Sequence, residues 1–381
     1  MAPFAAQTQP SSRCLLRSLL SACRKPLRRG VQASRADYYV KRHYSLSFAL
    51  ALVGYFLLGL DSLRQLRLQL AQDQQLAGAT QLRGISEAQL PKLLHARPPA
   101  LWSFLLVRLL SHLPEQQCPP QVKVMDTSFF VMGSKLFARR YQGACTPHTA
   151  GFKLGATFDP RAATPLRLEV QAGQGNDVQF LAALVPPAEN IAGQMYLFDR
   201  GFRCYAFFDE LIARGADFIT RAGPQIVYEV LDKLPLDPRH PQILADQLVL
   251  LGGPRTHMRH PLRRVVLQTA QGPLVFLSSA AYLTAFEVTE VYRRRWNIEV
   301  FFRWLKSAMG CVRSLGYSLE AAQHTLFAAL VAYLLVLRYD PTQTEIGRRG
   351  RLRGFKRALL ILHIRLHQPT PQSVQDGIDF L

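Results

Sequence analysis

Apolar residues recur at helical spacing in the first third of the chain and at strand spacing in the middle third. Helical stretches are predicted at about 46–58, 61–77, 86–95 and 101–113. The third begins at Ser86, where the residues S-E-A-Q fit a capping box. The proline-rich stretch 114–121 ends this pattern. The pattern therefore predicts a helical domain over 45–115, which could bind DNA.

The middle of the chain alternates between strands and helices. Strands are predicted at 122–131, 151–158, 166–171, 194–198 and 217–220, and helices at 178–185 and about 203–214. The Pro-, Gly- and Val-rich stretch 221–282 has alternating apolar runs, which predict an antiparallel β insertion. Helices follow at 287–307 and about 319–337. This order predicts an α/β fold with a mixed sheet flanked by helices.

The predicted helix 287–307 contains no Pro or Gly and has a polar stripe beside an apolar one. At about 100° of rotation per residue, four polar residues share an arc of roughly 60°: Tyr292, Arg295, Glu299 and Lys306. A neighbouring arc about 100° wide is apolar and faces a core. A carboxylate flanked by Arg, Lys and Tyr could hold a metal ion beside a phosphate. The alternative is an amphipathic helix whose charged face is only solvated.

The charge of the chain favours a polyanionic partner. Lys and Arg number 46 against 26 Asp and Glu, which gives a formal charge of +20. DNA or RNA is the simplest partner of such a protein; a membrane surface and an ordinary basic protein are the alternatives. Residues 1–44 contain many basic residues and a single acid, Asp37. We expect them to form a basic arm that is partly unstructured and able to contact DNA. The composition also resembles that of a transit peptide. A basic tail is expected over 339–381.

Cysteine usage and apolar runs argue against secretion and against membrane insertion. The six cysteines are scattered and form no C-x-x-C or zinc-type spacing, so we expect reduced thiols in a cytosolic protein. The apolar runs 48–60 and 326–337 are too short to span a bilayer comfortably. We expect both to be buried helices.

Three acids have contexts that surface placement does not explain. Asp126 lies within a predicted strand, where an unpaired buried carboxylate would be costly, and Asp199 directly follows another strand. With Glu299 they could hold two divalent cations about 4 Å apart, which is the arrangement of two-metal phosphodiester cleavage. Oxygen ligands favour Mg²⁺. The alternative is that each acid pairs with a nearby arginine.

These residues together carry a resemblance to a known family. Tyr292-x2-Arg295-x3-Glu299-x6-Lys306 resembles the Y-R-E-K signature of the family-four insertion-sequence DDE transposases, and VMDTS and LFDRGF resemble the family's blocks around Asp126 and Asp199. The resemblance implies an RNase H-like catalytic domain over 120–338 that is interrupted by the β insertion. It implies that Asp126, Asp199 and Glu299 are catalytic and bind two Mg²⁺, with Mn²⁺ as a substitute. Tyr292, Arg295, Trp296 and Lys306 would bind DNA phosphates.

The function implied by the resemblance is cut-and-paste transposition. The enzyme would cleave the terminal inverted repeats of a transposon and join the 3′-OH to target DNA, as a homodimer in the cytoplasm of a bacterium. Relatives that form hairpin ends stack a flipped base on a Trp of the insertion. Here the tryptophans are Trp102, Trp296 and Trp304, all outside 221–282, and Phe276 or Tyr282 could substitute. A catalytically inactive or domesticated DNA-binding derivative is the alternative function.

Overall fold

The computed structural model describes residues 12–38, 44–82, 84–111, 121–131, 151–161, 164–172, 175–223, 225–253, 256–307, 315–316 and 318–339. The chain divides into two compact units. A helical unit comprises 1–113, 132–140 and 303–381, and a sheet unit comprises 114–131 and 141–302. The expected tail 339–381 lies almost wholly outside the described residues, as does the beginning of the expected arm.

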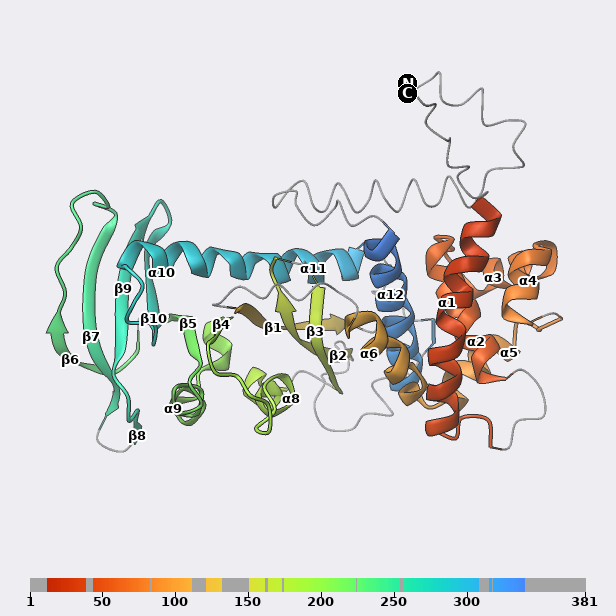
Figure 1. Cartoon of the computed structure of the whole chain (residues 1–381), viewed down its shortest axis with the longest axis horizontal. Helices are drawn as coiled ribbons and strands as arrows, with labels where there is room; N and C mark the ends of the chain where they lie inside the picture. Colours follow the sequence, from red (N-terminus) through yellow and green to blue (C-terminus); the bar gives the residue numbers. More distant parts are fainter. Residues whose placement is uncertain are drawn as a thin grey trace, which may run out of the picture. The chain divides into compact units, whose positions relative to one another are not determined.

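The helical unit is built around one helix that is buried on nearly every side. Its elements are α1 (Ser12–Ala33), α2 (Ser45–Leu57), α3 (Leu63–Gln72), α4 (Gln74–Thr80), α5 (Gln89–Ala96), η1 (Pro99–Trp102), α6 (Ser103–Ser111) and α12 (Leu319–Tyr339). The buried helix is α2, which packs against α1, α4 and α12 (Figure 1). Within the described part of the chain, no helix is long and apolar enough to cross a membrane.

The expectation of a partly unstructured N-terminal arm is wrong over 12–33, which form α1. The apolar residues of α1 recur every three or four positions and are buried: Leu16, Leu20, Cys23, Leu27 and Val31. Gly30 lies so close to the Leu101 carbonyl of η1 that a Cβ would overlap it. Packing of this stripe therefore orders the helix, despite its basic residues.

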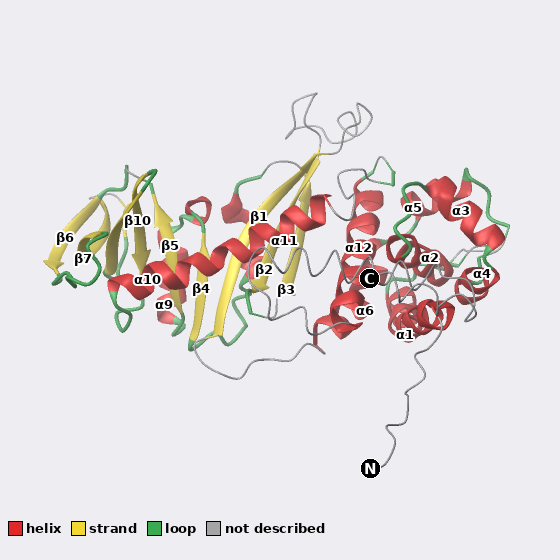
Figure 2. Cartoon of the chain, turned by 90° about the horizontal axis from the view of Figure 1, so that it is seen from above, coloured by secondary structure: helices red, strands yellow, loops and turns green. Residues whose placement is uncertain are grey.

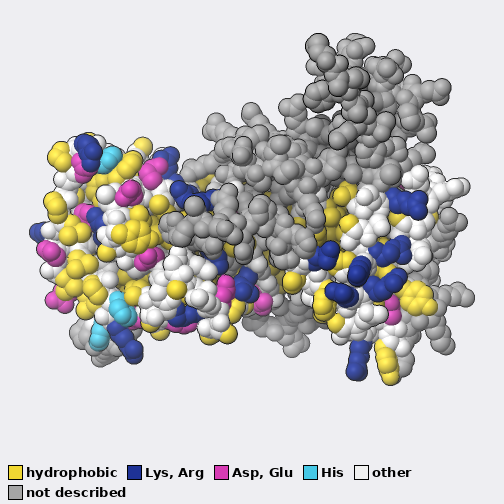
Figure 3. All heavy atoms as spheres, viewed as in Figure 1, with side chains coloured by type: hydrophobic (Ala, Val, Ile, Leu, Met, Phe, Trp, Pro, Cys, Tyr) yellow, Lys and Arg dark blue, Asp and Glu magenta, His cyan; other side chains and the backbone are white. Residues whose placement is uncertain are grey.

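The basic residues of α1 lie on its outer side. Arg17, Lys25, Arg28 and Arg29 are exposed. On the face drawn in Figure 3, Lys and Arg side chains gather over the helical unit, whereas acids and bases are interspersed over the β insertion. The excess positive charge of the chain is therefore visible on this unit.

Two predicted helices have different boundaries in the structure. The predicted helix 61–77 is two helices, because the Asp73 Oδ1 accepts hydrogen bonds from the backbone N–H groups of Gln75 (2.8 Å) and Leu76 (3.1 Å) and so starts α4. At Ser86 the Gln89 side chain accepts from the Ser86 N–H at 2.9 Å, but α5 begins only at Gln89.

The sheet unit contains one mixed sheet, ten-stranded among the described residues. Its strands are β1 (Gln121–Val131), β2 (Gly151–Asp159), β3 (Thr164–Ala172), β4 (Gln194–Phe198), β5 (Asp217–Ala222), β6 (Tyr228–Lys233), β7 (Ile243–Gly253), β8 (Thr256–His257), β9 (Leu262–Thr269) and β10 (Gly272–Ser278). The order is β3-β2-β1-β4-β5-β10-β9-β7-β6, with β8 paired to β7. The order β3-β2-β1-β4-β5, antiparallel across β1–β3 and parallel across β1–β4–β5, is that of the RNase H fold. The predicted fold class is confirmed.

The β insertion continues this sheet. β10 pairs antiparallel with β5, and β9, β7 and β6 follow outward. The strands of the insertion are therefore hydrogen-bonded to the strands of the RNase H core.

Helices cover both faces of the sheet (Figures 1 and 2). On one face η2 (Asp177–Phe180), α8 (Leu181–Leu184), η3 (Arg200–Phe202) and α9 (Tyr205–Ala213) enclose an aromatic core that includes Phe198, Phe208 and Phe218. On the other face α10 (Ala285–Tyr292), η4 (Arg293–Arg295) and α11 (Trp296–Ser307) run back from the insertion across β4 and β1. A complete capping box at Thr284 and Glu287 starts α10.

Candidate active site

The sheet register aligns two of the predicted carboxylates. Met125 of β1 pairs with Phe198 of β4, so the next residues, Asp126 and Asp199, continue the same row. Adjacent strands are about 5 Å apart and side chains alternate between faces. Met125 and Phe198 are buried in the aromatic core, and Asp126 therefore points to the opposite face, toward α11.

Arg295 connects Asp126 to Glu299. Its Nη1 donates to the Asp126 Oδ2 at 3.1 Å, and its Nη2 donates to the Glu299 Oε1. The guanidinium is largely buried, with 10% of the side chain exposed. The site thus contains a positive charge held between carboxylates from a strand and from a helix.

A short 3₁₀ turn changes the predicted geometry of this helix. The stretch 287–307 was expected to be one α-helix, but Arg293–Arg295 form η4 between α10 and α11. A 3₁₀ turn rotates about 120° per residue instead of about 100°, so Arg295 comes closer to the line of Tyr292 than the α-helical estimate gives. The Arg295 guanidinium lies 5.8 Å from the centre of the Tyr292 ring.

Tyr292 is buried beside the row of acids. Its hydroxyl donates to the Phe198 carbonyl at 3.4 Å, and its ring packs edge-on against Phe276 of the insertion, with the ring centres 5.1 Å apart. Burial raises the pKa of the Tyr292 hydroxyl, so it stays neutral and acts as a hydrogen-bond donor. In this state Tyr292 links α10 to the carboxyl end of β4.

The carboxylates influence one another. Burial is the main reason that the pKa of Asp126 rises to about 7, and the charges of Asp199 and Glu299 add to the rise. The Arg295 charge and the Thr127 N–H, which donates to Asp126 Oδ1 at 2.8 Å, oppose it. Clustered acids are expected to behave in this way when cations do not fully neutralise them.

The described residues do not form a ready-made metal cage: nowhere among them are three His, Cys, Asp or Glu side chains grouped so as to hold an ion. The guanidinium of Arg295 instead pairs with two of the three predicted ligands, Asp126 and Glu299. The carboxylate oxygens of the three predicted ligands are donors of the type that Mg²⁺ binds. The metal triad stays a prediction.

The other two predicted DNA-binding residues lie elsewhere on α11. Trp296 directly follows Arg295 and is 41% exposed. Lys306 is half-buried in the last turn, seven residues after Glu299. Of the two aromatics suggested as substitutes for a stacking Trp, Phe276 is buried under Tyr292, whereas Tyr282 is 62% exposed.

A fourth acid, Asp177 of η2, contacts residues next to the site. Asp177 pairs with Lys153 at 2.5 Å and accepts a hydrogen bond from the Thr127 hydroxyl, next to Asp126. A Cβ at Gly201, two residues after Asp199, would overlap the Asp177 carboxylate. The neighbouring Asn176 caps η2, because its side chain accepts a hydrogen bond from the Val178 N–H at 3.3 Å. In the sequence, Gly201 was the one indication that another group packs closely behind Asp199.

Comparison with known proteins identifies the family of the chain. Residues 117–335 match the family described as transposase DDE domain, which is more than half of the chain. The chain belongs to the DDE transposase family. The match contains β1, β4 and α11 and hence every residue of the candidate site.

Two curated transposases are similar to this DDE transposase. One is a putative transposase, y4zB, of Sinorhizobium fredii, 26% identical over 49% of this chain and 52% of its own. The other is a probable transposase for insertion sequence element IS5377 of Geobacillus stearothermophilus, 24% identical over 60% of this chain and 59% of its own. The chain therefore spans less than two thirds of these relatives. A piggyBac transposase synaptic complex with hairpin DNA also aligns, at 13% identity and a TM-score of 0.45 over 99% of this chain and 87% of the other.

Proposed function

We propose that this DDE transposase cleaves phosphodiester bonds at transposon ends in a metal-dependent reaction and joins the freed 3′-OH to target DNA. The observation that supports the proposal is that the sheet register puts Asp126 and Asp199 in one row, while Arg295 contacts both Asp126 and Glu299. Asp199 directly follows β4, and ligands of open α/β sheets bind at the carboxyl ends of the strands.

The proposed metal ligands are Asp126, Asp199 and Glu299. Bound between them, Mg²⁺ or Mn²⁺ would supply a strong nucleophile from water and stabilise the leaving oxygen. Because burial raises the pKa of Asp126, a cation bound there would compete with a proton for this carboxylate.

Arg295 is the proposed phosphate ligand nearest the carboxylates. A guanidinium can donate two parallel hydrogen bonds to a phosphate, as it now donates to Asp126 and Glu299. Tyr292 would position Arg295 from within the fold, and Trp296 and Lys306 would contact the same strand further along α11.

The proposed substrates are the terminal inverted repeats of a transposon and a target duplex, in the cytoplasm of a bacterium. The net charge of +20 supports a DNA partner. Two copies of the chain would bring two ends together. After the first cut the 3′-OH either attacks target DNA directly or first forms a hairpin on the opposite strand; end-labelled substrates on denaturing gels separate these routes.

Glu299→Gln tests the catalytic assignment. The variant keeps a side chain of similar shape but removes the charge, so we expect DNA binding in EDTA to persist and Mg²⁺- or Mn²⁺-dependent nicking of supercoiled DNA to disappear. The matched control is Glu290→Gln, which removes an exposed acid of α10 that pairs with Arg293 at 2.6 Å. Nicking by Glu299→Gln at the wild-type rate would refute the role of Glu299. Absence of nicking by the wild-type protein would favour an inactive DNA-binding derivative.

A further inference from the structure

Asp177, the first residue of η2, contacts the two chain segments that carry the strand carboxylates of the candidate site. Its Oδ1 accepts a hydrogen bond from the hydroxyl of Thr127, which follows Asp126 in β1. Its Oδ2 lies against Gly201, which follows Asp199 by two residues, and a Cβ at Gly201 would overlap this oxygen. One side chain therefore connects the segment that contains Asp126 to the segment that contains Asp199.

The orientations of Asp126 and Asp199 depend on the segments that Asp177 contacts. The Asp126 Oδ1 accepts a hydrogen bond from the Thr127 backbone N–H at 2.8 Å. In the same way the Asp199 Oδ1 accepts from the Arg200 backbone N–H at 2.8 Å, where Asp199 caps η3. A movement of Thr127 or of η3 would therefore move the carboxylate that is bonded to it.

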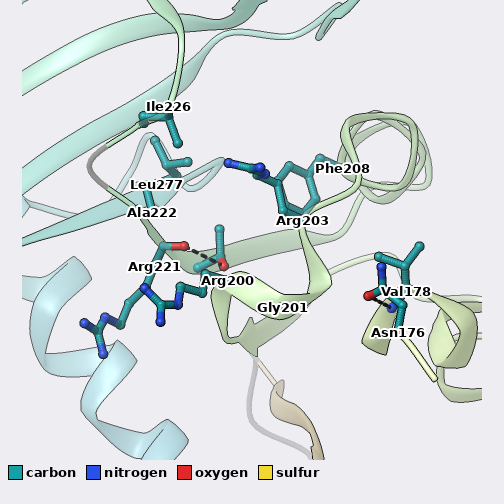
Figure 4. Close-up of a pocket in the computed structure, with 12 residues that line it drawn as sticks. Asn176, Val178, Arg200, Gly201, Arg203, Phe208, Arg221, Ala222, Ile226 and Leu277 are labelled. Atoms are coloured by element: carbon teal, nitrogen blue, oxygen red, sulfur yellow. Dashed lines mark hydrogen bonds between the residues drawn. The ribbon is translucent and has the colours of Figure 1, made fainter. Parts of the chain in front are cut away.

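Asp177 is itself held in place next to η3. Lys153 of β2 forms an ion pair with its Oδ1 at 2.5 Å, and 16% of the Lys153 side chain is exposed. The chain neighbours of Asp177, Asn176 and Val178, line one pocket together with Gly201 (Figure 4). The ion pair from β2 and the contact with Gly201 therefore fix the carboxylate between two strands and a turn.

The pairing of β1 with β4 ends just before the two acids. In the part of the chain that the structure describes, the last pair of this ladder is Met125–Phe198, one residue before each acid. Side chains of a strand alternate between faces, so Thr127, two residues after the buried Met125, faces the aromatic core and η2. Asp177 therefore contacts the strand ends from the face opposite α11 and beyond the last pair of the ladder.

We propose that Asp177 is a positioning residue that keeps Asp126 and Asp199 at the distance that a shared metal ion requires. It would contact neither the metal nor the DNA, because Asp126 points toward α11 and Asp177 lies on the opposite face. Replacing a residue that orients metal ligands from behind lowers metal affinity by about 10–100-fold. This inference rests on the proposed function, in which these acids bind metal.

The test is Mn²⁺ binding by Asp177→Ala and by Thr127→Val, which removes the hydroxyl but changes neither charge nor shape. Mn²⁺ is titrated into protein saturated with a duplex oligonucleotide, with the oligonucleotide alone as the blank. Electron paramagnetic resonance measures the free ion, so the readout does not depend on activity. Both substitutions should raise the dissociation constant for Mn²⁺ by about 10–100-fold. Because they remove the same contact, the double variant should bind about as weakly as Asp177→Ala alone.

The controls are Thr127→Ser and Asp209→Ala. Serine retains the hydroxyl, so Thr127→Ser should bind Mn²⁺ with nearly the wild-type affinity. Asp209 of α9 is a comparable acid whose carboxylate accepts from the backbone N–H groups of Arg259 at 3.0 Å and of His260 at 3.1 Å, both in the insertion. Its replacement removes the same charge and should lower stability while Mn²⁺ affinity stays unchanged.

The outcomes separate this inference from the proposed function. Unchanged Mn²⁺ affinity in Asp177→Ala and Thr127→Val, with unaltered circular dichroism spectra, refutes the positioning role even if the wild-type protein binds Mn²⁺ and nicks DNA. Loss of affinity in Asp177→Ala but not in Thr127→Val would show an effect of charge alone and overturn the inference. An equal loss in Asp209→Ala would show general destabilisation and overturn it too. Absence of Mn²⁺ binding by the wild-type protein would refute the proposed function, and this inference with it.

Discussion

His324 of α12 is a buried histidine whose protonation should destabilise the helical unit. The Trp102 Nε1 donates to His324 Nδ1 at 2.8 Å, and His324 Nε2 lies 3.0 Å from the Arg97 carbonyl oxygen. Because Trp only donates and a carbonyl only accepts, the ring must carry its proton on Nε2. A second proton on Nδ1 would point at the Trp102 N–H. The neutral ring therefore satisfies both partners, whereas the charged ring does not.

The size of the effect follows from the pKa. Burial lowers the pKa of His324 from 6.5 to about 4, although the Arg97 carbonyl and Glu320 act in the opposite direction. The unfolded chain then binds more protons than the folded one below about pH 6.5, so stability falls as the pH falls. The shift predicts a loss of about 2 kcal/mol between about pH 8 and pH 5 from this residue. The loss approaches its limit near the folded pKa.

Urea unfolding followed by circular dichroism measures this loss. The matched variant is His324→Gln, which cannot titrate but retains an N–H for the Arg97 carbonyl. Because it cannot titrate, its free energy of unfolding should fall less than that of the wild type between about pH 8 and pH 5, by about 2 kcal/mol. Equal pH dependence in the two proteins would refute the assignment of the neutral, Nε2-protonated ring.

Two further predictions concern packing and reactivity. Gly201→Ala should displace the Asp177 carboxylate from its partners and reduce stability by about 1–3 kcal/mol in urea unfolding. The control Gly78→Ala, at an open position in α4, should increase stability by about 0.5–1 kcal/mol. Equal effects of the two substitutions would contradict the packing argument. Burial raises the pKa of the Cys23 thiol to about 12, so mass spectrometry should find Cys23 unmodified by iodoacetamide in the native protein after the half-buried Cys204 has reacted. Modification of Cys23 first would show that α1 opens readily.

Much of the sheet was predictable because its strands are long, apolar and bounded by turn residues. The predicted strand 194–198 has the bounds of β4, and the acids at its end and in β1 were recognisable as polar residues in apolar surroundings. The insertion was predictable as antiparallel strands. Its attachment to β5 was not, because alternation within a strand does not specify its partner.

The misses share a physical cause, which is pairing between residues far apart in the sequence. Asp246 of β7 is 4% exposed and pairs with Arg263 of the neighbouring strand at 2.5 Å, a pairing that the sequence around either residue does not indicate. The place of Arg295 between Asp126 and Glu299 depends on how η4 crosses β1, which the spacing within one helix does not reveal. In α1 the apolar residues form a buried stripe although basic residues stand between them in the sequence.

The guanidinium between Asp126 and Glu299 has a thermodynamic consequence if these acids bind metal as proposed. A cation could approach them only as Arg295 leaves, and Arg295 leaves at little cost when a phosphate is present to receive it. DNA and metal would then each strengthen the binding of the other by the same factor, since such coupling is reciprocal. The transposase would then bind its metal fully only when a DNA strand is also bound.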